Sequence, residues 1–116
     1  MQLEERKVGD VTVIVVSGDI TQNKGGDLVL KKKVGDVLQQ GHKKLILDLG
    51  GVSYVDSAGL GELVQAYATT KKQGGTLKLV AVTTRLRDLL TITKLVTVFD
   101  SYDKQADAVA SFTTSA

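Results

Sequence analysis

The feature that most constrains this chain's fold is a regular alternation between two hydrophobic periods. Short apolar runs typical of buried strands, such as residues 11–17 and 45–49, are followed by segments in which apolar residues recur at helical spacing. Nearly continuous apolar strands separated by amphipathic helices favour a mostly parallel sheet covered by helices. We therefore predict an α/β fold with a mixed sheet and the element order ββαβαβαβα.

Glycines are expected to mark the turns between these elements. Gly9 with Asp10 is typical of a tight hairpin, which would pair the first strand antiparallel to the second. Gly41 is expected to end the first helix, and Gly74-Gly75 the second. The expected strands are 3–8, 11–17, 45–49, 77–82 and 96–99. Loops after the parallel strands gather on one edge of such a sheet, where sites form, and here they would be 18–23, 50–57 and 83–85.

Composition limits the chemistry available to the chain. Its 116 residues suffice for one domain with one core, expected over residues 1–116. Cys is absent, which removes disulfides, thiolate nucleophiles and Cys-based metal sites and makes a reducing cytoplasm the default location. His42 is the only histidine, so a multi-His metal site cannot form within this chain. We expect no metal, no cofactor and no catalytic residue.

Charge patterning gives no sign of a nucleic-acid or membrane partner. The net charge is +2, and the basic residues form short runs that we interpret as solvated surface. Nucleic-acid binding would favour a denser basic stripe or interleaved aromatic residues. The longest uncharged stretch has nine residues, 108–116, whereas a membrane-spanning helix needs about 20.

The loop 50–57 leads into a helix whose first turns are unusual. Gly59 and Gly61 lie in these turns, and each glycine costs about 1 kcal/mol relative to Ala in a helix interior. Locally unfavourable residues of this kind tend to mark functional sites. We predict that both glycines allow close approach by a partner more than they serve the fold.

Ser57 lies where the N-cap or the first residue of this helix is expected. Its hydroxyl can cap the helix. Alternatively, it can accept a phosphate, which the free amides and the positive end of the helix dipole would stabilise. The neighbouring Asp56 would then orient the hydroxyl for a kinase, or it would serve as a second capping group. The residue types alone leave both interpretations open.

A catalytic role for Ser57 is disfavoured by its distance from the only histidine. His42 precedes the strand at 43–49 and Ser57 follows it, and seven strand residues span about 23 Å. The G-x-S-x-G sequence of serine hydrolases is also absent.

Other phosphate-handling classes match the sequence poorly. Gly59-x-Gly61 is not followed by the third glycine of a dinucleotide fingerprint, because Val64 stands there, and no P-loop sequence is present. A receiver-type domain would use Asp48 as phosphoacceptor. Such domains pair acidic residues after the first strand and carry Lys-Pro after the last strand, and this chain has neither feature.

The segments 45–49 and 52–61 together resemble the signature of the STAS family, specifically the bacterial anti-sigma factor antagonists. Residues 15–20 resemble the family's second strand and turn, and residues 86–98 its third helix and last strand. The resemblance implies a non-enzymatic protein that, when unphosphorylated, binds an anti-sigma factor and so frees a sigma factor. It also implies that the anti-sigma factor is an ATP-dependent serine kinase and that a PP2C-type phosphatase restores the binding form.

Carried over residue by residue, the resemblance implies that Ser57 is the phosphorylated serine. The family often has an acidic residue or Asn two positions after Asp19, where this chain has Thr21. The implied partner-binding residues are Asp19, Thr21, Asp56, Ser57, Ala58, Gly59 and Gly61. Two alternatives stay open: a STAS subunit of a chemosensory, stressosome-like or transporter-linked assembly, and a small nucleotide-binding or receiver-like domain.

Overall fold

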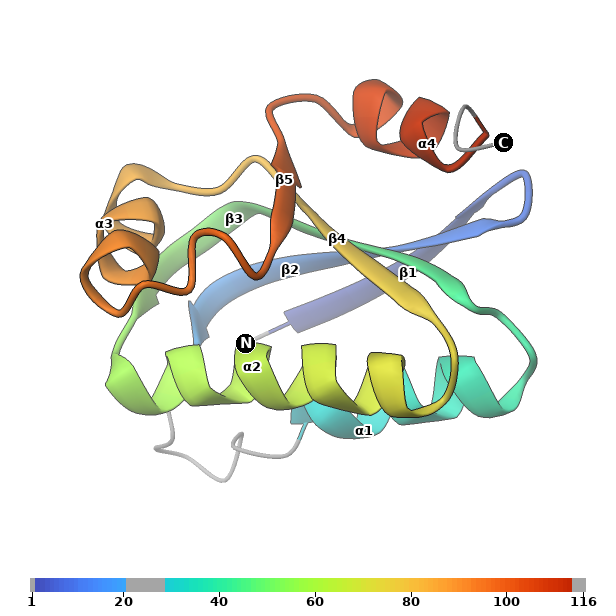
Figure 1. The fold of residues 1–116 in the computed structure, drawn as a ribbon, viewed down its shortest axis with the longest axis horizontal. Coiled ribbons are helices and arrows are strands. Elements are labelled where there is room, and N and C mark those ends of the chain that lie inside the picture. The colour runs from blue at the N-terminus through green and yellow to red at the C-terminus, as the bar shows by residue number, and fades with distance from the viewer. Residues whose placement is uncertain (1, 21–28, 114–116) are drawn as a thin grey trace.

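The computed structural model describes residues 2–20 and 29–113, which form a five-stranded sheet with helices on both faces (Figure 1). The predicted order ββαβαβαβα is confirmed. The elements are β1 (Gln2–Val8), β2 (Val11–Ile20), α1 (Val29–Gln39), β3 (Lys44–Val55), α2 (Ser57–Lys72), β4 (Thr76–Val80), α3 (Thr84–Ile92), β5 (Asp100–Tyr102) and α4 (Gln105–Thr113).

The strands lie in the sheet in the order in which they occur in the chain. β1 pairs antiparallel with β2, and β2, β3, β4 and β5 pair parallel with their neighbours. The predicted hairpin is present, because Gly9 has the positive φ of +62° that a tight turn of this kind requires. The mixed, mostly parallel sheet is therefore confirmed.

The sheet divides the hydrophobic core into two clusters. Leu45 and Leu47 of β3 face the larger cluster, which α1 and α2 cover, while Ile46 between them faces the smaller cluster under α4. This alternation follows from the two-residue period of a strand. Figure 1 shows α1 and α2 on one face of the sheet and α4 on the other. Both faces of the central strands are thus buried, which explains their nearly continuous apolar sequence.

Two strands are longer than predicted, because β2 runs on to Ile20 and β3 runs on to Val55. The prediction of loops at 18–20 and 50–55 is therefore wrong. The two extensions pair with each other through two register shifts, and Gly18 has a positive φ of +86°. A Cβ at Gly51 would lie 3.1 Å from the Cβ of Ser17. Glycines in these strands thus accommodate β-bulges rather than a loop.

The last strand is also misplaced in the sequence-based prediction, since 96–99 is a turn and β5 begins at Asp100. The amides of Leu95 and Val96 both donate to the carbonyl of Leu90, at 2.8 and 3.1 Å. These backbone groups close the end of α3 and are not available to a sheet. Phe99 is buried and packs edge-on against Tyr67, with ring centroids 5.1 Å apart. Phe99 and the partly buried Leu95 therefore serve the core without forming a strand.

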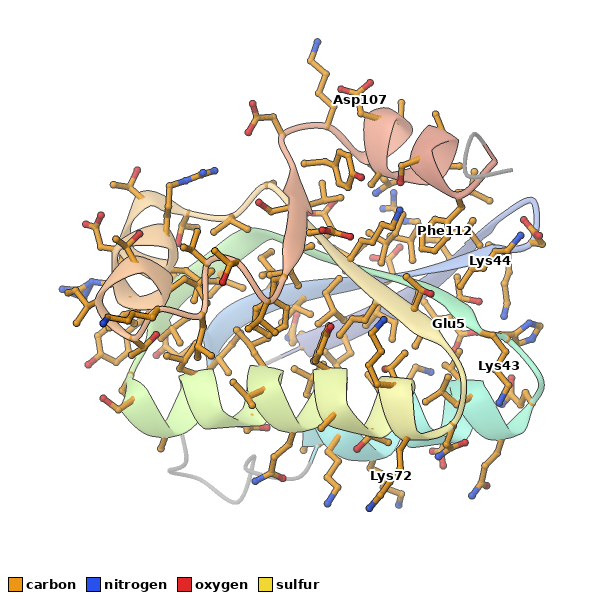
Figure 2. All side chains as sticks on the ribbon, in the orientation of Figure 1. Glu5, Lys43, Lys44, Lys72, Asp107 and Phe112 are labelled. Carbon is orange, nitrogen blue, oxygen red and sulfur yellow. The ribbon has the colours of Figure 1, made fainter. Side chains whose placement is uncertain are left out.

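Most lysines of the short basic runs are exposed, as Lys72 and Lys43 illustrate in Figure 2. Two of them form ion pairs instead: Lys33 of α1 with Glu5 of β1 at 2.7 Å, and Lys44 of β3 with Asp10 at 2.6 Å.

Among the described residues, the helices are too short or too polar to cross a membrane.

Candidate functional site

A groove of about 660 Å³ lies where the end of β3 and the start of α2 meet α3. It joins two of the three segments that the sequence predicts at this edge of the sheet. The groove is lined by Tyr54, Val55, Asp56, Ser57, Thr84, Arg85, Asp88, Leu89 and Ile92.

Asp56, not Ser57, caps α2. Its backbone is extended, with φ −99° and ψ −178°, and its carboxylate accepts a 2.7 Å hydrogen bond from the amide of Gly59. The Asp56 carbonyl accepts from the amide of Leu60 at 2.8 Å. Ser57 is the first helical residue and is exposed. Of the two residues that could cap the helix, Asp56 is therefore the cap, and the Ser57 hydroxyl is not needed for capping.

Gly59 is required by the fold itself. It is buried, and a Cβ built on it would lie 1.7 Å from the carbonyl oxygen of Ile20 at the end of β2. The predicted reason for this glycine, space left for a partner, is therefore wrong, because the space is filled by the protein's own backbone. Gly61 differs, since a Cβ there would meet nothing within 4 Å.

Arg85 is a site residue that the sequence analysis did not single out. Its guanidinium carbon lies 5.1 Å from the centre of the Tyr54 ring, so that α3 and β3 contact each other across the groove. Arg85, Asp88 and Ile92 are spaced i, i+3 and i+7 and share one face of α3. That spacing, next to a loop already predicted at the sheet edge, is the signal by which they could have been found.

The groove surface is partly apolar. Tyr54 and Ile92 are 41% and 76% exposed. Val96 and Val98, which follow α3, are also exposed. This part of the described surface combines apolar area with charged groups, as protein-binding surfaces do.

The remaining predicted partner-binding residues lie near the groove or outside the described chain. Asp19 is exposed on β2 and is paired with Tyr54 in the β2–β3 register. Ala58 and Gly61 are half-buried in the first turns of α2. Thr21 lies outside the described residues.

Asp48, which a receiver-type domain would use, and His42, which a catalytic serine would need, do not line the groove. Asp48 lies on the α4 side of the sheet, where its carboxylate accepts from the Gly50 amide and from the Gln105 side chain, both at 3.1 Å. His42 follows α1, at the opposite end of β3 from Ser57. In the described part of the chain, no three His, Asp or Glu residues are grouped so as to hold a metal ion.

Comparison with known proteins finds a matching domain family and several similar proteins. The STAS domain model matches residues 2–108. The anti-sigma-B factor antagonist of Bacillus subtilis is 38% identical over 97 residues, which cover 78% of this chain and 88% of that protein. The crystal structure of TM1081 from Thermotoga maritima has a TM-score of 0.82 and 26% identity, and the match covers 94% of this chain and 92% of that one.

The fold is also shared with the Bacillus cell fate determinant SpoIIAA, whose structure is known in the phosphorylated form. The TM-score is 0.73 at 16% identity, and the match covers 96% of this chain and 99% of that one. The family model spans nearly the whole chain, and the B. subtilis antagonist is 38% identical over 97 residues. The chain therefore belongs to the STAS-domain family of anti-sigma factor antagonists.

Proposed function

We propose that this protein is a cytoplasmic binding module without catalysis of its own, which in its unphosphorylated form binds an anti-sigma factor and so frees a sigma factor. The groove between β3, α2 and α3, with Asp19 beside it, forms the proposed binding surface. The similarity to the B. subtilis anti-sigma-B factor antagonist supports an anti-sigma factor as the partner.

Phosphorylation of Ser57 is the proposed switch. The partner, acting as a serine kinase, transfers the γ-phosphoryl group of ATP to the Ser57 oxygen; the hydroxyl proton is lost and ADP is released. A PP2C-type phosphatase hydrolyses the phosphoester with water and restores the hydroxyl. The single observation that carries this proposal is that Ser57 is exposed at the start of α2 while Asp56 supplies the cap.

Charge explains how one phosphate can end binding without unfolding. Phosphate adds about −1.5 to −2 charge at neutral pH, beside the carboxylates of Asp56 and Asp88 that line the same groove. Like charges brought together across an interface cost several kcal/mol, and about 1.4 kcal/mol is a tenfold change in affinity. The cap of α2 is untouched, so the fold persists.

The test is co-purification of the wild-type protein with its anti-sigma factor, followed by incubation with ATP. Mass spectrometry should find phosphate on Ser57 and the complex should dissociate, whereas the Ser57→Ala protein should stay bound. Phosphate on another residue, or a complex that persists after Ser57 is phosphorylated, would contradict the proposal.

A further inference from the structure

We propose that Arg85 is an internal phosphate-binding residue: when Ser57 is phosphorylated, the Arg85 guanidinium leaves the Tyr54 ring and pairs with the phosphate. This inference rests on the proposed function, because it supposes that Ser57 carries a phosphate. It concerns what the modified protein does within itself, before any partner is present.

The charges around the groove favour a cationic side chain as the partner of a phosphate on Ser57. Among the described residues that line it, Asp56 and Asp88 are anionic and Arg85 is the one cation. Asp19 adds a third carboxylate on the strand beside Tyr54. The Asp56 carboxylate already holds the Gly59 amide, one of the groups with which a helix start would bind an anion. A phosphate on Ser57 would therefore enter an acidic setting, in which Arg85, a cation lining the same groove, is the strongest partner that the described residues offer.

Arg85 is free to make this exchange. It is exposed, and no carboxylate of the described residues lies within 4.0 Å of its guanidinium, unlike Arg87 on the same helix, which reaches Asp103 at 4.0 Å. Its contact with Tyr54 is a cation–π interaction at an exposed site, which is weak. Two parallel charge-assisted hydrogen bonds to a phosphate are stronger and match the planar fork of the guanidinium.

The exchange would alter the binding surface as well as its charge. In the unphosphorylated protein the guanidinium covers one side of the Tyr54 ring and bridges β3 to α3. After the exchange, the ring loses that cover and the cation lies nearer the start of α2. Phosphorylation would thus change the shape of the groove that the partner contacts, with no movement of the backbone.

The experiment uses phosphoserine placed at position 57 during translation, so that no kinase is needed. The pKa for the second ionisation of the phosphate is measured by ³¹P NMR in the full chain and in its Arg85→Gln, Arg85→Lys and Arg87→Gln variants. A neighbouring cation favours the dianion, so the pKa should be lower in the parent than in Arg85→Gln by roughly half a unit to one unit. Arg85→Lys should give an intermediate value, because it keeps the charge without the fork. Arg87→Gln, the matched control, should resemble the parent.

Equal pKa values in the parent and in Arg85→Gln would overturn the inference. A second readout tests the movement: the side-chain protons of Arg85 should lose the ring-current shift from Tyr54 when position 57 carries phosphate, and an unchanged shift would contradict the exchange. Neither measurement involves the kinase or the anti-sigma factor. The inference can therefore fail while the proposed function holds, and the proposed function can fail in the co-purification test while Arg85 still binds the phosphate.

Discussion

The first residues of α2 divide structural and regulatory roles among close neighbours. Asp56 caps the helix, Gly59 lets the helix start pack against the end of β2, and Ser57 lies between them with its side chain exposed. A group added to Ser57 therefore removes neither the cap nor a backbone contact. This separation is what would let a phosphate change binding while the fold stays intact.

The two glycines of α2 should respond in opposite ways to the same substitution. Gly59→Ala places a methyl group against the Ile20 carbonyl and should lower the free energy of unfolding by about 3 kcal/mol or more, the upper end for overpacking. Gly61→Ala meets open space and should raise it by up to about 1 kcal/mol through helix propensity. Urea denaturation of both variants checks this. Equal effects would mean that the close approach of Gly59 to β2 is wrong.

Substitutions at the neighbouring residues Asp56 and Ser57 form a second matched pair. Asp56→Ala removes the cap and should cost about 1 kcal/mol, up to about 2. Ser57→Ala should change the free energy of unfolding by less than about 0.5 kcal/mol, as exposed positions outside such features do. Thermal unfolding monitored by circular dichroism measures both. A loss at Ser57 as large as that at Asp56 would assign the cap to the serine.

At the scale of elements, the sequence predicts the helices whose positions depend on hydrophobic period. It fails for strand boundaries that depend on backbone contacts between distant residues. Helical spacing and terminal glycines locate α1 and α2 well, because amphipathic patterning and caps are local properties. The length of β3 depends on β2 continuing beside it to Ile20, and the start of β5 depends on the amides of 95 and 96 turning back to Leu90. The need for Gly59 likewise arises from a residue 39 positions earlier, Ile20. No local pattern carries those contacts.

One ion pair joins the edge strand β1 to α1 and makes stability depend on pH. The hydrogen bond from Lys33 at 2.7 Å, followed by that from Lys7, holds the pKa of Glu5 below its ordinary value. A lowered folded-state pKa contributes stability that is present above the unfolded pKa of about 4.3 and is lost as the pH falls through the folded value.

Glu5→Gln should therefore cost up to about 1 kcal/mol at pH 7, and the difference from wild type should shrink as the pH falls below about 4. Urea denaturation between pH 7 and pH 3 measures the difference. The control is Glu4→Gln, whose pair with Arg6 is more exposed and lies within one strand; it should cost less. Parallel pH curves for wild type and Glu5→Gln would show that the pair contributes nothing.

On the scale of the whole molecule, the groove lies at the edge of the five-stranded sheet where β3 ends. α4 covers the face of the sheet opposite to α1 and α2. The sequence predicts a site at this edge because parallel strands bring their carboxyl ends together, and the structure brings the end of β3 and the start of α2 to the start of α3 there. It does not predict the contact of Tyr54 with Arg85, since that depends on the direction of two side chains from separate elements.

The isolated chain should not bind ATP appreciably. Its sequence has no phosphate-binding P-loop, and the proposed kinase activity resides in the partner. Isothermal titration calorimetry with the purified protein should give no measurable heat of binding at micromolar ATP. A dissociation constant in the low micromolar range would favour the nucleotide-binding alternative.

The most direct test of the central claim is the affinity of the anti-sigma factor for wild type, Ser57→Ala, Ser57→Asp and the Ser57 phosphoprotein, measured at one ionic strength because salt screens the charge effect. Wild type and Ser57→Ala should bind alike, and only Ser57→Ala should stay bound when ATP is added. Ser57→Asp should bind more weakly, and the phosphoprotein most weakly, because one carboxylate supplies about half the charge of phosphate. If Ser57→Asp and the phosphoprotein bind as tightly as wild type, Ser57 is not the switch.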